Sequence, residues 1–464
     1  MSESTGTWRF PRHFWAANVV ELFERAAYYG VFIGLVVYLT RNYGFSDVGA
    51  GWVAAYFAAV IYLVPPFAGA WADRVGFRLA LVLAFSLLTV GYAMLGFFGT
   101  TLARALLGAG GIQVMAVVSL TVILLGGALV KPVISGTAAR SSDEHNRARA
   151  FSIFYTVVNI GSFTGKTIAY PLRTMLGLEY VSYYSAFMGL LGVIVVLLFY
   201  RGIDSHDGER KSYAEIARGF ATVLRNGRFM ALIFIVAGFW IIQGQVYASM
   251  PKYILRTVGE HARPEWIANI NPAVVVAMAI VITQLVRRVR PVASIGIGLA
   301  IIPFTALSIA LSPILEAMTG TSIPLLGTTV HPITLCLVVG IGLQGLAECF
   351  LSPRFLEYAS KQAPPGEEGL YMGYSHLHTF FAWSVGFVLS GYLLDAFCPD
   401  PSTLPLAQHQ AHTLALQYGT ALPEAYAHAH YIWYVFAAIG AVALVCLLAF
   451  DAITRRSDAR SAQG

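Results

Sequence analysis

Residues 69–99 have the sequence GAWADRVGFRLALVLAFSLLTVGYAMLGFFG, a short charged turn followed by a long apolar run. The apolar part, residues 79–99, contains no Asp, Glu, Lys or Arg. A helix needs about 20 predominantly apolar residues to cross the hydrocarbon core of a bilayer. This stretch therefore predicts a membrane-spanning helix that begins just after a tight turn at the membrane surface.

The same pattern recurs along the whole chain. Candidate spans lie near 13–41, 47–73, 79–99, 112–138, 148–171, 179–200, 229–255, 265–286, 291–313, 331–361, 369–396 and 427–453. Charged residues make up only 12% of the chain, against about a quarter in soluble domains. We therefore expect an all-α membrane protein of about 12 transmembrane helices, six within residues 1–200 and six within residues 229–464, with a polar linker at 201–228 between the two sets.

The distribution of basic residues predicts the orientation. If the N-terminus is cytoplasmic, most Lys and Arg residues fall in cytoplasmic loops, as the positive-inside rule requires. We expect a multi-pass protein of the plasma (bacterial inner) membrane with both termini cytoplasmic. The net charge of +6 then reflects topology, and no nucleic-acid partner is expected. The start, Met-Ser-Glu-Ser-Thr, lacks the features of a removable signal peptide.

Two segments outside the spans carry weaker signals. In the linker, Tyr213, Ile216, Phe220 and Val223 have near-helical spacing, which favours an amphipathic helix on the inner membrane face over a plain solvated linker. The outer segment 397–426 is expected to form a partly ordered cap. The four cysteines have no metal-type spacing, so we expect no disulfide framework, no metal and no cofactor.

Charged residues inside the spans are the strongest functional signal, because each costs a few kcal/mol at the bilayer centre. Glu21, Glu24 and Arg25 share one face of the first span. Two carboxylates beside one guanidinium leave one acid without a full partner, which suits a proton-coupled switch better than a structural ion pair. Lys131, before Pro132, and Glu348, after several small residues, are placed to hold opposite ends of a zwitterion.

Other polar and aromatic residues in the spans have less certain roles. Lys166 is interpreted as pairing with an acid of the first span. His376 and His378 are interpreted as titratable groups or as hydrogen-bonded packing residues. Tyr29, Tyr56 and Trp240 are candidates to line a cavity, although such aromatic residues are more often lipid-facing or buried.

The turn at residues 69–78 resembles the loop motif of the major facilitator superfamily. It places an acid at a helix end beside basic residues, and the resemblance implies a conformational latch formed by Gly69, Asp73, Arg74, Gly76 and Arg78. The fold implied is two six-helix bundles that rock about a central site.

A more specific resemblance is to the proton-dependent oligopeptide transporter family. Its motifs match Glu21-x-x-Glu24-Arg25-x-x-Tyr28-Tyr29-Gly30, Lys131-Pro132, Phe154–Phe163, Asn271-Pro272, Glu348, Ser352-Pro353 and Lys361-Gln362-Ala363-Pro364, in order along the chain. The resemblance implies proton-driven import of di- and tripeptides by a protein that is expected to be monomeric.

The resemblance also implies roles for single residues. Glu21, Glu24, Arg25, Lys131 and Glu348 would couple transport to protons. The substrate would be bound by Arg25, Tyr29, Tyr56, Lys131, Asn159, Trp240, Asn271 and Glu348. In that arrangement Arg25 and Lys131 hold the peptide carboxylate, and Asn271 and Glu348 hold the amino terminus.

The chain departs from the family pattern at three positions. Phe32 stands where the family often has arginine, Gly244 where it has the partner acid, and Ser375 where it has a tryptophan. Loss of both members of an ion pair leaves no orphan charge. The departures keep three alternatives open: an importer of another small zwitterion or carboxylate, a proton-coupled exporter, and a receptor without turnover. An intramembrane enzyme is disfavoured, since no His-Glu-x-x-His motif is present.

Overall fold

The computed structural model of this chain describes residues 10–142, 146–201, 212–325, 327–362 and 374–461. The chain forms two compact units, one of Met1–Phe45 and Val60–Arg218, the other of Ser46–Ala59 and Gly219–Gly464. The expected domain boundaries at 200 and 228 stay predictions. Of the linker, residues 202–211 lie outside the described residues, and the remainder contains the expected helix, α8 (Tyr213–Arg225).

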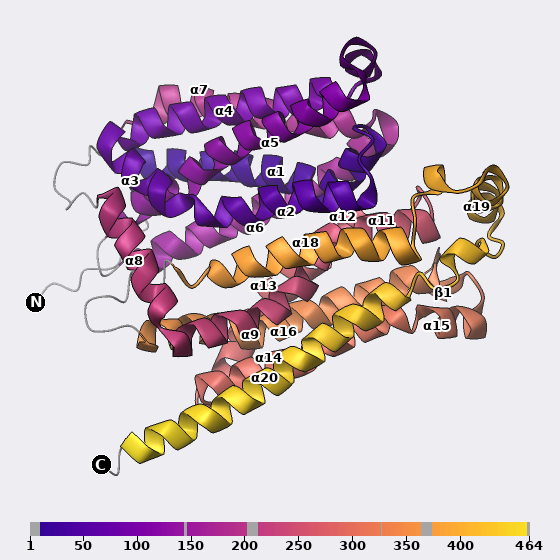
Figure 1. Cartoon of the computed structure of the whole chain (residues 1–464). Coiled ribbons are helices and arrows are strands. Elements are labelled where there is room, and N and C mark those ends of the chain that lie inside the picture. Colours follow the sequence, from indigo (N-terminus) through magenta and orange to yellow (C-terminus); the bar gives the residue numbers. More distant parts are fainter. Residues whose placement is uncertain (1–9, 143–145, 202–211, 326, 363–373, 462–464) are drawn as a thin grey trace, which may run out of the picture. The chain divides into compact units, whose positions relative to one another are not determined.

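The first unit consists of long helices. Its elements are α1 (Arg12–Arg41), the later part of α2 (Asp47–Leu63), α3 (Pro65–Val75), α4 (Phe77–Phe98), α5 (Thr101–Arg140), α6 (Arg147–Met175), α7 (Leu178–Phe199) and the start of α8. Helix α1 packs against α5, α6 and α7, and α4 packs against α5 and α7 (Figure 1). The helix α1 is therefore the centre of the unit, and 19 of its 30 residues are buried.

The second unit contains more short elements. They are α9 (Gly227–Gln243), α10 (Gln245–Ala248), α11 (Met250–Thr257), α12 (Pro264–Ile267), α13 (Ile270–Leu285), α14 (Pro291–Ala310), α15 (Ser312–Thr319), α16 (Pro332–Gln362), α18 (Leu377–Phe397), α19 (Leu406–Tyr418) and α20 (Tyr431–Ser461), with the 3₁₀ turns η1 (Pro401–Thr403) and η2 (Glu424–Tyr426). An antiparallel hairpin, β1 (Ile323–Leu325) and β2 (Thr328–Val330), pairs Ile323 with Val330. Helix α14 packs against α16 and α20 (Figure 1).

The expected all-α membrane architecture is confirmed. In the described parts of the chain, ten helices are long and apolar enough to span a membrane, or eleven if α2 and α3, bent by 52°, form one broken span. Helix α6 coincides with the expected span 148–171 but is not among the ten. The eleventh expected span begins at residue 369, and its first residues lie outside the described ones, as do Ala363 and Pro364.

Prolines and glycines explain why several spans are broken. Pro65 begins α3 directly after the bend at Val64, because proline lacks the N–H that would continue the helix. The seventh expected span, 229–255, is divided into α9, α10 and α11 by Gly244 and by Ser249 before Pro251. The hairpin and α12 were not expected. Their lengths of three and four residues are too short for a periodic sequence pattern.

Candidate functional site

The acid–arginine group of α1 forms as the sequence predicts. The Nε of Arg25 lies 3.3 Å from the Oε1 of Glu21, and the guanidinium also forms an ion pair with Glu24. Both carboxylate side chains are at most 2% exposed, and that of Arg25 is 13% exposed. The Oε2 of Glu21 is buried and has no hydrogen-bond partner within the described residues. Two buried acids therefore share one cation.

Residues of two other helices lie near this group. Lys131 of α5 interacts electrostatically with Glu21, Glu24 and Arg25, and its side chain is exposed. Tyr92 of α4 is 2% exposed and interacts with Glu24 and Arg25. Sequence reasoning missed Tyr92, because one tyrosine in an apolar helix gives no signal that separates a site from a packed core. The structure thus brings Lys131 together with the α1 group in one unit.

Glycines allow α6 to pack directly against α1. A Cβ added to Gly165 would lie 2.2 Å from the carbonyl oxygen of Ala26, and one at Gly161 would lie 2.7 Å from the Cβ of Arg25. This contact holds Lys166, the next residue of α6, with its Nζ 5.5 Å from the centre of the Tyr29 ring. The amide of Asn159 donates to the carbonyl oxygen of Tyr155 within α6, at 2.8 Å.

The second unit contains the other predicted ionisable residue. The Nδ2 of Asn271 in α13 donates to the Oε2 of Glu348 in α16 at 3.3 Å. A Cβ on Gly345 would lie 2.9 Å from the carbonyl oxygen of Asn271, so this glycine allows the two helices to approach closely. The contact joins two of the predicted substrate residues in one polar pair.

Trp240 lies beside His378. Their ring centres are 5.2 Å apart, and the Nδ1 of His378 donates to the carbonyl oxygen of Ser375 at 2.6 Å. The histidine is 4% exposed, which agrees with the interpretation as a hydrogen-bonded packing residue. Tyr56 is 39% exposed and belongs to the part of α2 that is counted with the second unit.

Packing explains two of the three departures from the family pattern. Phe32 is 1% exposed and stacks on Tyr28, with the ring centres 5.0 Å apart. A Cβ on Gly244 would lie 3.1 Å from the Nε1 of Trp383. An apolar stack and a tryptophan therefore occupy the space near these two positions.

The turn between α3 and α4 anchors neighbouring helices within the first unit. Arg140 of α5 bonds to Asp73 at 3.0 Å, and Arg78 donates to the carbonyl oxygen of Leu197 in α7 at 2.9 Å. The guanidinium of Arg74 lies 4.2 Å from the centre of the Tyr213 ring in α8. Gly76 has a φ of 90°, which disfavours any other residue there. A Cβ added to Gly69 would lie 3.2 Å from the Cβ of Pro132.

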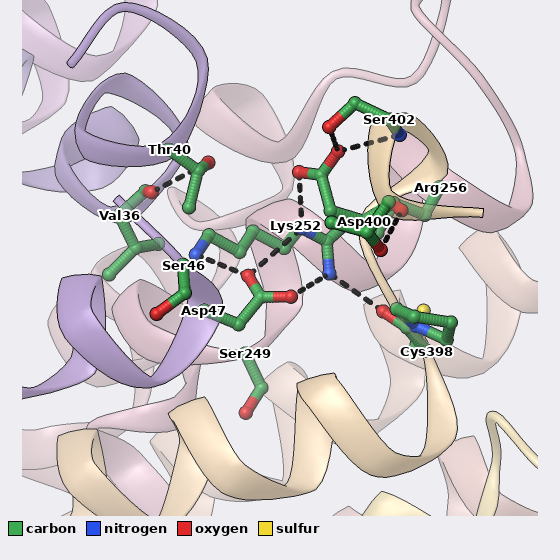
Figure 2. A network of polar contacts seen from close by, with 12 residues as sticks. Val36, Thr40, Ser46, Asp47, Ser249, Lys252, Arg256, Cys398, Asp400 and Ser402 are labelled. Atoms are coloured by element: carbon green, nitrogen blue, oxygen red, sulfur yellow. Dashed lines mark hydrogen bonds and ion pairs between the residues drawn. The ribbon is translucent and has the colours of Figure 1, made fainter. Parts of the chain in front are cut away.

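A buried charge network in the second unit was missed by sequence reasoning. The Asp47 carboxylate accepts from the Nζ of Lys252 at 2.7 Å and from both Nη atoms of Arg256 at 2.8 and 2.9 Å (Figure 2). Arg256 also bonds to Asp400 at 2.9 Å and to the carbonyl oxygen of Cys398 at 2.6 Å. The sequence did contain one sign of this network, because Lys252 and Arg256 stand one helical turn apart and therefore share a helix face.

Comparisons with known proteins place these units in a family. Residues 19–319 match the sequence profile of the Major Facilitator Superfamily. Dipeptide and tripeptide permease A of Erwinia pyrifoliae is 26% identical over 250 residues, or 53% of this chain and 48% of that protein. The protein of that name from Proteus mirabilis is 27% identical over 213 residues, which cover 45% of this chain and 41% of that protein. The chain therefore spans about half the length of the curated relatives it matches.

Solved structures with the same fold cover almost the whole chain. A POT family transporter in complex with 5-aminolevulinic acid has a TM-score of 0.68 at 20% identity, covering 96% of this chain and 97% of that one. The peptide transporter POT in complex with sulfate has a TM-score of 0.68 at 20% identity, and the match covers 97% of this chain and 96% of that one. At this identity the likeness establishes the fold. The relatives and structures confirm the resemblance drawn from the motifs.

Proposed function

The chain belongs to the major facilitator superfamily, and we propose that it is a proton-coupled symporter that imports di- and tripeptides by alternating access. The observation that carries the proposal is the α1 group, in which two buried carboxylates share the guanidinium of Arg25. An acid that lacks a full partner at membrane depth gains or loses a proton as the charge around it changes. The proton gradient then supplies the energy, without a cofactor.

Each unit offers the chemistry that one end of a peptide needs. In the first, Arg25 and Lys131 are cations suited to a carboxylate. In the second, Glu348 and Asn271 supply two acceptor oxygens to an ammonium group. A zwitterion is the ligand class that suits both. The names of the similar permeases support the choice of peptides among zwitterions.

Uptake into proteoliposomes under an imposed pH gradient, inside alkaline, tests the proposal. We expect labelled dipeptide to accumulate with the gradient and to equilibrate without it. Accumulation of amino acids or small carboxylates, and not of peptides, would identify the alternative importer. Ligand binding without any flux would identify a receptor. Accumulation only under the reversed gradient would identify an exporter.

The proposed cellular setting is the plasma (bacterial inner) membrane, with both termini cytoplasmic and the protein acting as a monomer. In this orientation the turn between α3 and α4 faces the cytoplasm, and Gly69, Asp73, Arg74, Gly76 and Arg78 form the latch. The ion pair between Asp73 and Arg140 supports that role, because it fixes the turn to α5.

A further inference from the structure

Arginines gather in the second unit where α14 begins and α20 ends. Residues 286–290, the turn between α13 and α14, contain three arginines, and residues 451–456 of α20 contain two. The two segments contain one acid, Asp451. The five side chains, called the arginine cluster below, are all exposed: Arg287, Arg288, Arg290, Arg455 and Arg456. The cluster therefore leaves four positive charges without an acid in the same segments.

The carboxylate of Asp451 brings the two segments together. Its Oδ1 accepts from the Nη2 of Arg290 at 2.7 Å, and its Oδ2 pairs with the Nη2 of Arg455 at 2.5 Å. The two arginine side chains stay 51% and 58% exposed in spite of this contact. A guanidinium has five N–H donors. Both groups therefore keep donors for a second anion.

The other arginines of the turn lie close to this pair. Arg287 and Arg288 are at most three residues from Arg290, which limits the separation of their backbones to about 11 Å. Neither forms an ion pair within the described residues. The turn is attached to α16, because Arg354 donates to the carbonyl oxygen of Val286. A structured turn thus presents two arginines that the fold itself does not use.

Exposed apolar side chains adjoin the arginine cluster on the same helices. Leu285 is the last residue of α13, and Ile453 stands two residues before Arg455 in α20; both are exposed. The helices α13 and α20 belong to candidate membrane spans. At such span ends, apolar side chains contact acyl chains and cations reach the headgroup layer. The surface therefore suits a ligand that has an anionic head and an apolar tail.

Membrane orientation alone does not require this arrangement. The positive-inside rule depends on how many Lys and Arg residues lie near the span ends, wherever they stand in the loops. It does not require that cations from α20 and from the turn before α14 meet at one carboxylate. The convergence at Asp451 is a property of the folded unit and favours a binding site.

We propose that the arginine cluster binds an anionic phospholipid of the type of phosphatidylglycerol. The phosphodiester oxygens accept charge-assisted hydrogen bonds from the guanidinium groups, and the acyl chains lie along Leu285 and Ile453. Clusters of about four to eight basic residues at the cytoplasmic end of a span are typical of sites for anionic lipids. In the proposed orientation the lipid belongs to the cytoplasmic leaflet. The inference does not depend on which substrate is transported.

The test measures lipid binding to the detergent-purified protein by native mass spectrometry. We expect dioleoylphosphatidylglycerol to bind at least about ten-fold more tightly than dioleoylphosphatidylcholine, whose headgroup has no net charge. The double variant Arg287→Gln/Arg288→Gln should weaken binding of the phosphatidylglycerol about 30-fold, the loss expected for two cations near an anionic surface. Binding of the phosphatidylcholine should not change. Replacement of the same two arginines by lysine should keep most of the preference.

The matched control is Arg12→Gln/Arg147→Gln. It removes the same charge from two exposed arginines at the starts of α1 and α6 in the first unit. We expect this variant to bind phosphatidylglycerol as the unaltered protein does. An equal loss in both double variants would show a general effect of net charge and would contradict the inference.

Other results would also overturn the inference. One is equal affinity for the two lipids in the unaltered protein, a result that needs no variant to fold. Another is unchanged binding of phosphatidylglycerol in Arg287→Gln/Arg288→Gln. Inorganic phosphate and glycerol 3-phosphate separate a lipid site from a site for a free anion. At the concentration of the lipid, neither should displace phosphatidylglycerol, and displacement by either would identify a free-anion site instead.

Discussion

Glu21, Glu24 and Arg25 show how few residues set the chemistry of the first unit. Their spacing puts all three on one helix face, and the packing of α1 at the centre of the unit removes them from solvent. In a pair of one acid and one arginine, the two charges would compensate each other and both groups would stay ionised. The second acid changes this, because one guanidinium cannot fully compensate two carboxylates.

Glu24→Gln tests the coupling role directly. Glutamine keeps the shape of the side chain but cannot exchange a proton. We expect gradient-driven uptake to fall to background, while counterflow exchange of peptide stays measurable, since exchange needs no net proton movement. Both are measured in proteoliposomes with labelled peptide. Glu21→Gln tests the other acid of the group in the same way. If gradient-driven uptake survives in both variants, the coupling proton binds elsewhere.

At the scale of elements, short helices between breaks carry the charge network of the second unit. Helix α11 has eight residues, all buried, and presents Lys252 and Arg256 to the first residue of α2. A Cβ on Gly391 of α18 would lie 2.7 Å from the carbonyl oxygen of Asp47, so α18 packs against the same residue. The network therefore fixes the beginning of α2 to α11 and α18.

Asp47→Asn should release this attachment. Breaking a buried ion pair by removing one partner costs about 3–5 kcal/mol, because the remaining cations stay buried without a full partner. Cys398 reports the change, since it is fully buried and its carbonyl oxygen binds Arg256. With Cys336, Cys349 and Cys446 replaced by serine, we expect maleimide to label Cys398 at least about ten-fold faster in the variant.

The control for this measurement is an exposed ion pair of the same unit. Arg290 bonds to Asp451 at 2.7 Å with its side chain 51% exposed, so Arg290→Gln should change stability by less than about 1 kcal/mol. Labelling of Cys398 should then match that of the unaltered background. Equal labelling rates of Cys398 in Asp47→Asn and in the background protein would show that the network does not keep the beginning of α2 attached to α11 and α18.

We expect the stability of α19 to depend on the protonation state of His412. Its Nε2 donates to the carbonyl oxygen of Arg256 at 2.7 Å, and its ring stacks on Tyr426. Burial lowers the pKa of His412 below its usual 6.5; nearby His409 and Arg256 add to this, while the hydrogen bond and Asp400 oppose it. Because the folded state favours the neutral ring, this stabilisation is complete above the unfolded pKa and is lost as the pH falls below it.

Hydrogen exchange measures this effect. After correction for intrinsic rates, the amides of α19 should exchange faster at about pH 5.5 than at about pH 7.5, while those of α20 change little. In His412→Gln the amide donor remains but no group titrates, so the difference between the two pH values should disappear. A difference that persists in the variant would assign the effect to another group.

At the scale of the whole molecule, the arrangement of basic residues predicts the orientation through the positive-inside rule. A reporter fused after Gly464 should be fluorescent as a green fluorescent protein and inactive as an alkaline phosphatase, because phosphatase folds only outside the cytoplasm. The reverse is expected for fusions after Gln410 in α19, an exposed position between the last two candidate spans. The opposite pattern at both positions would show that the predicted orientation is wrong.

The sequence by itself determined where most of the helices lie and that Glu21, Glu24 and Arg25 lie together on α1. Hydropathy is a local property, so windows of about 20 residues located nearly all of the spans. The α1 group was equally predictable, because residues at i, i+3 and i+4 share a helix face in any fold. The amphipathic helix α8 was predicted from the same local periodicity. A partly ordered cap at 397–426 was expected from its composition, and it contains the helix α19.

Only the tertiary structure decided which distant residues meet. Asp47 and Lys252 are 205 positions apart, and no periodic pattern relates them. The position of Lys166 against Tyr29 depends on how closely α6 packs on α1. Gly161 and Gly165 permit this close packing, but their presence in the sequence does not predict it. Helical periodicity shows which face of a helix is polar. The partner of that face is set by packing among helices, which depends on every side chain in the contact.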